Sequence, residues 1–490
     1  MNTNNRPGPA RYIFLAVLFI AIITAVLLVA NLQKKKGAEA YARMQKASLP
    51  IISLSLPEGF ETDLHGYVKE MNLLDMRDVI VPLSSEKSLN LTVRPCGSSV
   101  TSLAYEVRDL KGETLIDSGN IANVDQSKDT EITLKFSELI ESGTEYHLVL
   151  TLSFSDRSPV RYYTRILYAR TNYIDQLLEF VNTFSNATYN ADEADFIVNY
   201  IQPTDTSSTE DFYYTTIHSK YAMFTFSGTE VERLPGVKVR ITEMEPTQLS
   251  VTLEYSIVLD PQDSERTCDV REFFCTRSRS QKVYLLDYYR TVEQRFEADT
   301  STAEKGRIIL GVGDGQNQII NSANDVHTVF VDNREIRSYN AKTNAMNLIF
   351  SFEDDTDDTG RSSFDHHDMR IVKVTNEGDV DYMVYGYMNR GVFEGQVGIC
   401  FYRYQAAENA TKRLFFMPVA QSEQMLMMDL GTLAYVNDAD VCYLRYGDGI
   451  YSIDLNTGES VEVSIRAYPG MYAMNERGNV VAWQEGDDLN

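Results

Sequence analysis

The segment that decides the fold is TEYHLVLTLSFSDRSPVRYYTRILY, Thr144–Tyr168. Two runs that alternate or are rich in β-branched and aromatic residues, EYHLVLTLSF and VRYYTRILY, flank a turn signal at Asp156 to Pro159. Upstream lie the similar runs SLNLTV, SLAYEVRDL, ETLIDSG and TEITLKF, again separated by turn signals. Short strands at this spacing predict a mainly β fold, with an antiparallel sandwich over residues 49–170.

A tyrosine motif refines this prediction. In LIESGTEYHLVL, Leu139, Gly143 and Tyr146 match the pattern that precedes the penultimate strand of fibronectin type III and immunoglobulin-like domains. The segment resembles the tyrosine corner of those domains, in which the Tyr hydroxyl bonds back to nearby backbone. The resemblance implies an Ig/FnIII-like spacer or adhesion module rather than a catalyst.

Residues 171–212 have a helical pattern. YIDQLLEFVNTF spaces its apolar residues as one helix face, ADEADFIVNYI indicates a second short helix that Pro203 ends, and a polar segment follows. The pattern predicts a helical linker at a domain boundary.

Residues 213–490 again have a strand pattern and contain an internal sequence repeat. IRSYNAKTNAMN, Ile336–Asn347, shares four positions with IYSIDLNTGESV, Ile450–Val461, and in both a strand ends in a turn before another strand. The second copy resembles the outer hairpin of a β-propeller blade. VVAWQ, followed by a polar stop, then predicts an incomplete ring: either the natural protein is longer than 490 residues or the missing strands come from the N-terminal part of this region.

Charge and hydropathy indicate the location. The net charge is −25, and residues 1–36 hold five basic residues and no acid, which leaves 40 basic against 70 acidic residues in the body. Such a body repels nucleic acid, which we exclude as a partner. YIFLAVLFIAIITAVLLVANL, residues 12–32, is uncharged and long enough as a helix to span the roughly 30 Å hydrocarbon core. We predict a retained single-pass anchor between a cytoplasmic tail (1–11) and a stalk (33–48), with the acidic body extracytoplasmic. As a whole, the chain resembles uncharacterised bacterial membrane-anchored proteins with an Ig/FnIII-like domain and a propeller-like region.

The segment YGYMNRGVFEGQVG, Tyr385–Gly398, has two interpretations. Strand-like runs on both sides predict a hairpin whose connection uses Gly391 and Gly395. Alternatively it is a ligand-contacting loop, in which the polar contacts are Asn389, Arg390 and Glu394.

EDDTDDTGRSSFDHHD, Glu353–Asp368, is the richest acidic cluster. Asp355, Asp357 and Thr359 match the first half of a calcium loop, but the position of the bidentate Glu holds His366. The neighbouring histidines suit a transition metal instead, although adjacent side chains on a strand point to opposite faces. The third interpretation is a solvated acidic loop between blades.

Five cysteines are too few for a disulfide scaffold. Cys268 and Cys275 are either a disulfide across a hairpin or loop, or two unrelated thiols. The sequence contains no recognisable nucleophile, metalloprotease or phosphate-loop motif, and GVGDG at Gly311–Gly315 fits a turn better than a dinucleotide site.

These observations predict a non-catalytic protein that requires no cofactor and binds or scaffolds an envelope protein or polysaccharide. The alternatives are an envelope carbohydrate-active enzyme with carboxylates on a propeller face, and an extracytoplasmic sensor.

Overall fold

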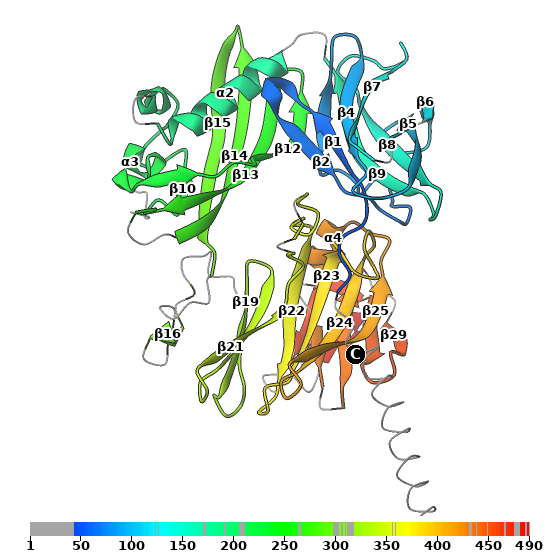
Figure 1. Cartoon of the computed structure of the whole chain (residues 1–490), viewed down its shortest axis with the longest axis vertical. Helices are drawn as coiled ribbons and strands as arrows, with labels where there is room; N and C mark the ends of the chain where they lie inside the picture. Colours follow the sequence, from blue (N-terminus) through cyan, green and yellow to red (C-terminus); the bar gives the residue numbers. More distant parts are fainter. Residues whose placement is uncertain are drawn as a thin grey trace, which may run out of the picture.

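The computed structural model is mainly β, as predicted, and the described residues form eight sheets (Figure 1). Among them no helix is long and apolar enough to cross a membrane. The predicted tail, membrane helix and most of the stalk, residues 1–43, lie outside the described residues. The structure describes residues 44–489 except 123, 126, 170–172, 191–192, 205–210, 263–265, 297–302, 305–306, 309, 311–317, 355, 358, 431–433, 438, 448, 465–466, 475–480 and 486–487.

The first body, which we call the sandwich, consists of two sheets that share one apolar core. One sheet has the order β2-β1-β4-β7, and the other has the order β3-β9-β8-β5-β6, with β3 parallel to β9. Tyr146, at the start of β8, accepts a hydrogen bond from the amide N–H of Glu141 at 3.2 Å, as the tyrosine motif predicted. Leu139 of the predicted motif is 66% exposed, and its neighbour Ile140 is buried in its place. The strands are β1 (Ile51–Ser55), β2 (Glu61–Leu64), β3 (Ile80–Leu83), β4 (Ser88–Arg94), β5 (Val100–Arg108), β6 (Leu115–Ala122), β7 (Thr130–Lys135), β8 (Glu145–Phe154) and β9 (Val160–Tyr168), with a short 3-10 turn η1 (Pro57–Gly59).

The second body is a long-stranded antiparallel sheet, β10-β15-β14-β13-β11, with β12 also paired to β13. Helix α2, expected in a linker, instead packs on β13, β14 and β15, because its apolar face is buried there. The elements are α2 (Tyr173–Ala187), η2 (Ala194–Asn199), β10 (Tyr214–Thr216), α3 (Tyr221–Phe224), η3 (Phe226–Gly228), β11 (Val231–Arg233), β12 (Lys238–Glu245), β13 (Gln248–Leu259), β14 (Arg266–Arg279) and β15 (Lys282–Gln294).

Of the two interpretations of Cys268 and Cys275, the disulfide is wrong and two separate thiols are found. Both residues lie on the single strand β14, and both thiols are free. At roughly 3.3 Å per residue, seven positions along a strand separate the two Cα atoms by about 23 Å, far beyond the ~7 Å that a disulfide tolerates. The odd spacing also places the two side chains on opposite faces of the sheet.

The third body, which we call the C-terminal array, contains three four-stranded sheets and one three-stranded sheet, and in each the strands pair in chain order. A two-stranded ribbon, β16 (Ala303–Glu304) with β17 (Arg307–Ile308), precedes it. The elements are β18 (Ile319–Asn321), β19 (His327–Asp332), β20 (Glu335–Asn340), β21 (Ala345–Phe350), β22 (His367–Val374), β23 (Val380–Tyr387), β24 (Val397–Gln405), β25 (Ala410–Pro418), α4 (Glu423–Leu430), β26 (Ala434–Val436), β27 (Val441–Tyr446), β28 (Gly449–Asp454), β29 (Ser460–Ser464), β30 (Ala467–Met474), β31 (Val481–Glu485) and β32 (Asp488–Leu489).

The two copies of the internal repeat occupy equivalent strands of two different sheets. They begin in β20 and β28, the third strands of their sheets. Oδ1 of Asn340 accepts hydrogen bonds from the amides two and three residues on, at 2.9 and 3.2 Å. Oδ1 of Asp454 does the same at 2.8 and 3.1 Å. The shared residues therefore build the same Asx turn twice.

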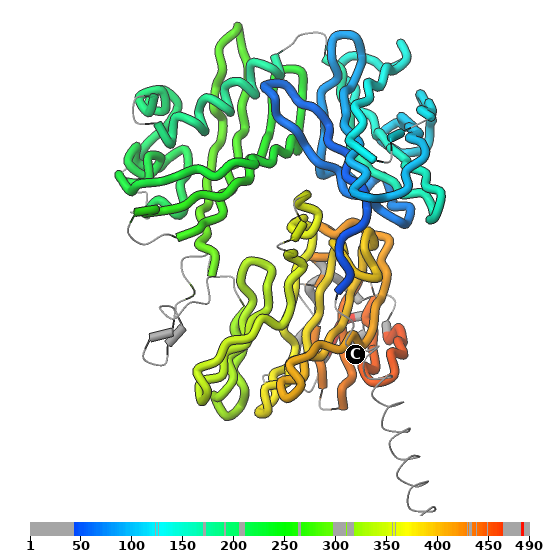
Figure 2. Tube along the Cα trace, in the orientation of Figure 1, coloured from blue at the N-terminus to red at the C-terminus, as the bar shows by residue number. Residues whose placement is uncertain are grey.

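The tube in Figure 2 shows the sandwich and the second body side by side, with the C-terminal array beneath them. One continuous apolar core runs through the sandwich and the second body. A separate cluster joins sandwich residues such as Met71 and Tyr163 to array residues such as Ile399 and Leu426. The first two bodies thus form one packed unit on which the array docks.

Candidate functional site

Three side chains from distant parts of the sequence meet where the bodies adjoin. We call Asp78, His366 and Glu423 the junction cluster. Asp78 precedes β3 of the sandwich, whereas His366 precedes β22 and Glu423 begins α4 in the array. Nδ1 of His366 lies 2.5 Å from Oε1 of Glu423 and 3.2 Å from Oδ2 of Asp78. Only 1% of Glu423 and 8% of His366 is exposed, so little water screens these charges.

Ring stacking and helix capping hold the cluster in place. The ring of Phe364 stacks between His366, with centroids 4.1 Å apart, and His65, with centroids 3.7 Å apart. Helix α4 begins at Glu423 because the hydroxyl of Ser422 accepts a hydrogen bond from the third amide of the helix at 3.4 Å. The first turn of a helix also favours a carboxylate through the helix dipole.

Two arginines of the second body border the cluster. Arg240, on β12, contacts Glu254 and Asp365 at 3.1 Å each. Arg271, on β14, contacts the same two acids at 2.6 and 3.1 Å. The two arginines and these two acids balance one another in charge. The imidazole of His366 is the positive group in direct contact with both carboxylates of the junction cluster, and Arg240 acts on Asp78 from farther away.

Burial and mutual charge set the protonation of the cluster. The pKa of Asp78 is raised to about 6: burial raises it most, the charge of His366 opposes the rise, and the Glu423 carboxylate adds to it. Burial alone lowers the pKa of His366, but the Glu423 and Asp78 carboxylates outweigh burial and place that pKa above its ordinary value. Burial raises the pKa of Glu423, but His366 outweighs it and lowers the pKa below its usual range. These shifts favour a charge-assisted hydrogen bond between Nδ1 of His366 and Oε1 of Glu423.

The second nitrogen of His366 has two neighbours. Nη1 of Arg240 lies 3.1 Å from Nε2, and Oδ1 of Asp365 lies 3.6 Å from it. A protonated Nε2 cannot accept from a guanidinium, so Asp365 is the partner of the charged imidazole. The Arg240 contact suits the neutral form with its proton on Nδ1.

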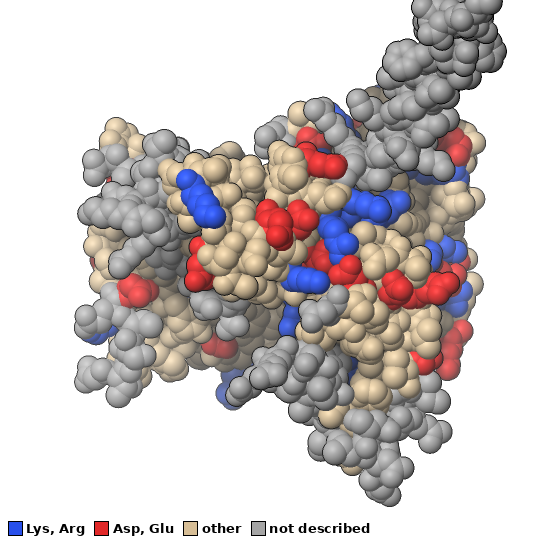
Figure 3. All heavy atoms as spheres, turned by 90° about the horizontal axis from the view of Figure 1, so that it is seen from below, with Lys and Arg blue, Asp and Glu red and all other residues tan. Residues whose placement is uncertain are grey.

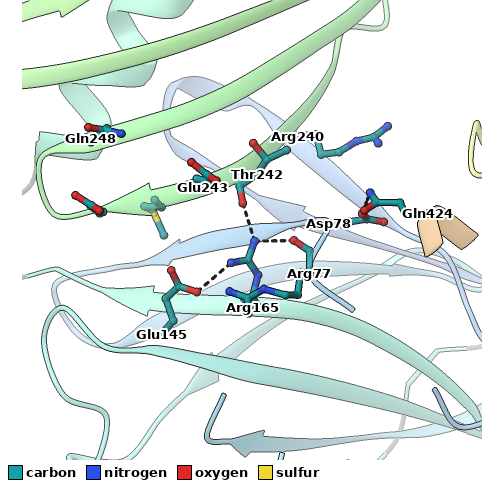
Figure 4. A pocket seen from close by; sticks show the side chains of 11 residues that line it. Arg77, Asp78, Glu145, Arg165, Arg240, Thr242, Glu243, Gln248 and Gln424 are labelled. Carbon is teal, nitrogen blue, oxygen red and sulfur yellow. Dashed lines mark hydrogen bonds and ion pairs between the residues drawn. The ribbon is translucent and has the colours of Figure 1, made fainter. Parts of the chain in front are cut away.

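Two cavities share Asp78 and Arg240 in their walls. The larger, about 560 Å³, lies between the sandwich and the second body, with Gln424 of α4 also in its wall, and appears in Figure 4. The smaller, about 360 Å³, is lined by side chains of all three bodies. Its volume is within the range of about 300–1,000 Å³ for small-molecule sites. The wall combines rings with charged groups, among them His65, Tyr67, Tyr163, Phe364, Arg94, Lys238, Asp365 and His366.

Arg165, on β9, joins the sandwich to the second body in the larger cavity (Figure 4). Its Nη1 donates to Oε2 of Glu145 at 3.0 Å. Its Nη2 donates to the carbonyls of Arg77 in the sandwich and Thr242 on β12, both at 2.6 Å. Because Arg165 is only 4% exposed, these contacts fix the guanidinium between the two bodies.

The segment around Asn389, Arg390 and Glu394 is the connection between β23 and β24, as the hairpin interpretation predicted. Gly391 and Gly395 have φ of +87° and +74°. All three polar residues serve internal contacts. Asn389 donates to the carbonyls of Ser362 and Phe364 at 2.7 and 2.8 Å, and Arg390 pairs with Asp354 at 3.0 Å. Glu394 accepts from the amides of Ser48 and Leu49 at 2.7 and 2.8 Å.

The segment that matches the first half of a calcium loop forms an Asx turn at Asp357. Oδ1 of Asp357 accepts from the amide N–H of Thr359 at 3.0 Å, and Oδ2 accepts from the amide of Ser362 at 2.8 Å. These bonds make an Asx turn and commit the carboxylate to backbone. Asp355 lies outside the described residues. Of the residues in the transition-metal interpretation, the structure places Asp365 3.6 Å from Nε2 of His366, and it adds Asp78 and Glu423, from other elements, beside Nδ1.

Sequence reasoning did not identify Asp78, Glu423, Arg240 or Arg165. Each stands alone in its segment, without a motif, and only the packing of the three bodies brings these residues together. The S-E-x-x start of α4 was a usable local signal, since Ser followed by an acid indicates a helix N-terminus. This signal locates a helix start but says nothing of the residues that the helix meets.

The face shown in Figure 3 carries basic and acidic side chains interspersed over the described residues, without a patch of one sign.

No protein-family model and no curated protein sequence matches the chain. Among solved structures, the tricorn protease has 9% identity and a TM-score of 0.21, covering 50% of this chain and 28% of its own length. A DUF4784 family protein from Bacteroides caccae has 11% identity and a TM-score of 0.17, covering 80% of this chain and 94% of its own. Both TM-scores lie below 0.5, so neither likeness supports an inference about fold or activity.

Proposed function

We propose that the protein is a single-pass, membrane-anchored binding protein of the cell envelope, and that its ligand occupies the 360 Å³ cavity at the junction of the three bodies. The observation that carries the proposal is that residues of all three bodies line this cavity. Tyr163 belongs to the sandwich, Lys238 to the second body and Phe364 to the array. A ligand that contacts all three would stabilise their docked arrangement by its binding free energy.

The sequence supports the anchor and the location. The uncharged run at residues 12–32 is long enough to span a bilayer. We also propose two details of the fold, an Ig/FnIII-like sandwich and an open β-propeller. The bond from Tyr146 to backbone supports an Ig/FnIII-like sandwich. The meander order of the array's sheets and their repeated Asx turn support blades of an open β-propeller.

The cavity chemistry favours a segment of an envelope polysaccharide. A sugar ring offers C–H faces that pack on aromatic rings and hydroxyl groups that both donate and accept hydrogen bonds. The rings of Tyr67, Tyr163 and Phe364 provide such faces. Arg94, Lys238 and the acids of the wall provide donors and acceptors for hydroxyl groups.

The test is calorimetric titration of the full chain, held in detergent micelles, with soluble envelope polysaccharide. We expect saturable binding that weakens at least tenfold in Lys238→Ala, which removes an exposed wall residue. The matched control is Lys282→Ala at the start of β15, which should bind like the wild type. Absence of binding, or equal weakening in both variants, would contradict the proposal. Release of reducing ends would favour the carbohydrate-active enzyme instead, with Asp78 as the first acid to replace, because burial raises its pKa to about 6.

A further inference from the structure

We propose that Asp78, His366 and Glu423 form a binding site for one divalent transition-metal ion of the Zn²⁺ class. The inference goes beyond the proposed function and does not depend on it, because all three metal ligands are side chains of the protein itself, whatever the cavity binds. One ligand atom from each residue lies within 4.8 Å of the other two.

The spacing suits a single ion. Zinc takes nitrogen and oxygen ligands at about 2.0–2.2 Å, so two ligand atoms of a tetrahedral site lie roughly 3.4 Å apart. Nδ1 of His366 is 3.2 Å from Oδ2 of Asp78 and 2.5 Å from Oε1 of Glu423. The first distance fits without change. The second requires the Glu423 carboxylate to retreat by about 1 Å, which replaces its hydrogen bond with a metal bond.

The donor set selects the ion. One imidazole nitrogen with two carboxylate oxygens suits zinc, manganese or ferrous iron, whereas calcium prefers an all-oxygen site. Three protein ligands leave a fourth position open. Asp78 and His366 also line the 360 Å³ cavity, which makes the ion reachable from that space.

Each ligand has an outer partner of the kind that orients metal ligands. The amide of Gln424 donates to Oδ1 of Asp78. The hydroxyl of Tyr67 lies 3.5 Å from both carboxylate oxygens of Glu423. Oδ1 of Asp365 lies 3.6 Å from Nε2 of His366, so a metal on Nδ1 leaves the Nε2–H to a carboxylate. Arg240 would then give up its Nε2 contact and keep its pairs with Glu254 and Asp365.

Charge provides an independent argument. Arg240 and Arg271 are matched by Glu254 and Asp365 through four contacts of 2.6 to 3.1 Å. The junction cluster then retains two carboxylates, one of them 1% exposed, beside a single imidazole. Buried charge without compensation is costly. A dication in contact with both carboxylates supplies twice the positive charge of one imidazolium, while Arg240 acts on Asp78 from farther away.

The experiment uses the full chain in detergent micelles after treatment with a chelator. Zn²⁺ is titrated by calorimetry, bound metal is counted by mass spectrometry, and Co²⁺ serves as a visible probe of coordination. We expect one equivalent of Zn²⁺ and a Co²⁺ absorption band typical of four or five ligands. His366→Gln and Glu423→Gln should weaken Zn²⁺ binding at least 100-fold and abolish the band.

The matched control is His218→Gln, which removes an exposed imidazole far from the cluster in sequence. It should leave uptake unchanged. Asp78→Asn, at a less buried ligand, keeps the proposal testable if a Glu423 variant fails to fold. The proposal is overturned if the folded wild type takes up no stoichiometric Zn²⁺, if the cluster variants bind as the wild type does, or if His218→Gln alone removes the uptake. Loss of polysaccharide binding with intact Zn²⁺ uptake would affect only the proposed function.

Discussion

Replacing Arg165 tests how the sandwich and the second body are held together. In Arg165→Met the aliphatic stem remains and the guanidinium is lost. When β12 moves away from the sandwich, the bond that breaks is the one from Nη2 to the carbonyl of Thr242, at 2.6 Å. The bonds to Glu145 and the Arg77 carbonyl stay within the sandwich and survive that opening.

The expected change in the free energy of opening follows from this one hydrogen bond. A hydrogen bond to a charged group contributes about 1.5–3 kcal/mol. The carbonyl of Thr242 faces a cavity that water can enter, so we take about 2 kcal/mol, or roughly a 30-fold change in an equilibrium constant. Strand β12 packs against β2 and β3. Its amides should therefore exchange with deuterium about 30-fold faster in Arg165→Met than in the wild type.

The assay is hydrogen exchange read by mass spectrometry on peptides that cover β12. Arg161→Met is the matched control: it lies on the same strand β9, but its partner at 3.5 Å, Glu70, is 77% exposed, and such surface pairs contribute little. The control should leave exchange in β12 unchanged. If Arg165→Met folds and its β12 amides exchange at the wild-type rate, Arg165 does not hold the two bodies together and the reasoning is refuted.

Three further predictions follow from individual contacts. Burial raises the pKa of Asp332 to about 6, so the folded protein binds a proton at this carboxyl more tightly than the unfolded chain does, and the stability that this proton gives declines as pH rises from about 4 through about 6. The melting temperature of Asp332→Asn should therefore exceed that of the wild type at pH 8 but not at pH 4.5. An equal difference at both pH values would contradict this. Glu394→Ala removes the acceptor of the Ser48 and Leu49 amides, so trypsin should cut after Lys46 several-fold faster than in the wild type or in an exposed control, Glu408→Ala. Without reductant, iodoacetamide should label the half-exposed Cys275 before the buried Cys268, and a peptide linking the two would show that the assignment of free thiols is wrong.

Local patterns in the sequence predicted local structure well. Strand alternation predicted the strands of the sandwich, the resemblance to a tyrosine corner predicted the bond made by Tyr146, and the internal repeat predicted the turn that Asn340 and Asp454 build in two sheets. The bond of Tyr146 and the two turns join residues close in the chain. The same reasoning misplaced α2 as a linker, because an apolar helix face does not say which sheet will cover it.

The site could not be predicted from the sequence because its residues are far apart in the chain. His366 meets Glu423, 57 residues away in the chain, and Tyr67 meets Glu423 across 356 residues. Neither contact leaves a periodic or spaced signal. The disulfide prediction failed for a related reason: a spacing of seven fits both a hairpin and a single strand, and β14 is unusually long at 14 residues.

The position of the junction cluster follows from how the three bodies share their cores. Sandwich and second body are joined by one continuous apolar core, so separating them would expose the interior of both. The array docks on this unit through a smaller apolar cluster and through polar contacts, among them the bond from Tyr387 to the Gly66 carbonyl at 2.8 Å. Separating the array from the other two bodies would therefore expose less apolar surface than separating the sandwich from the second body. The cluster spans that boundary, with Asp78 on one side and His366 and Glu423 on the other, so whatever neutralises its carboxylates also strengthens the docking. A ligand or ion bound there would stabilise the docked arrangement of the array by its binding free energy.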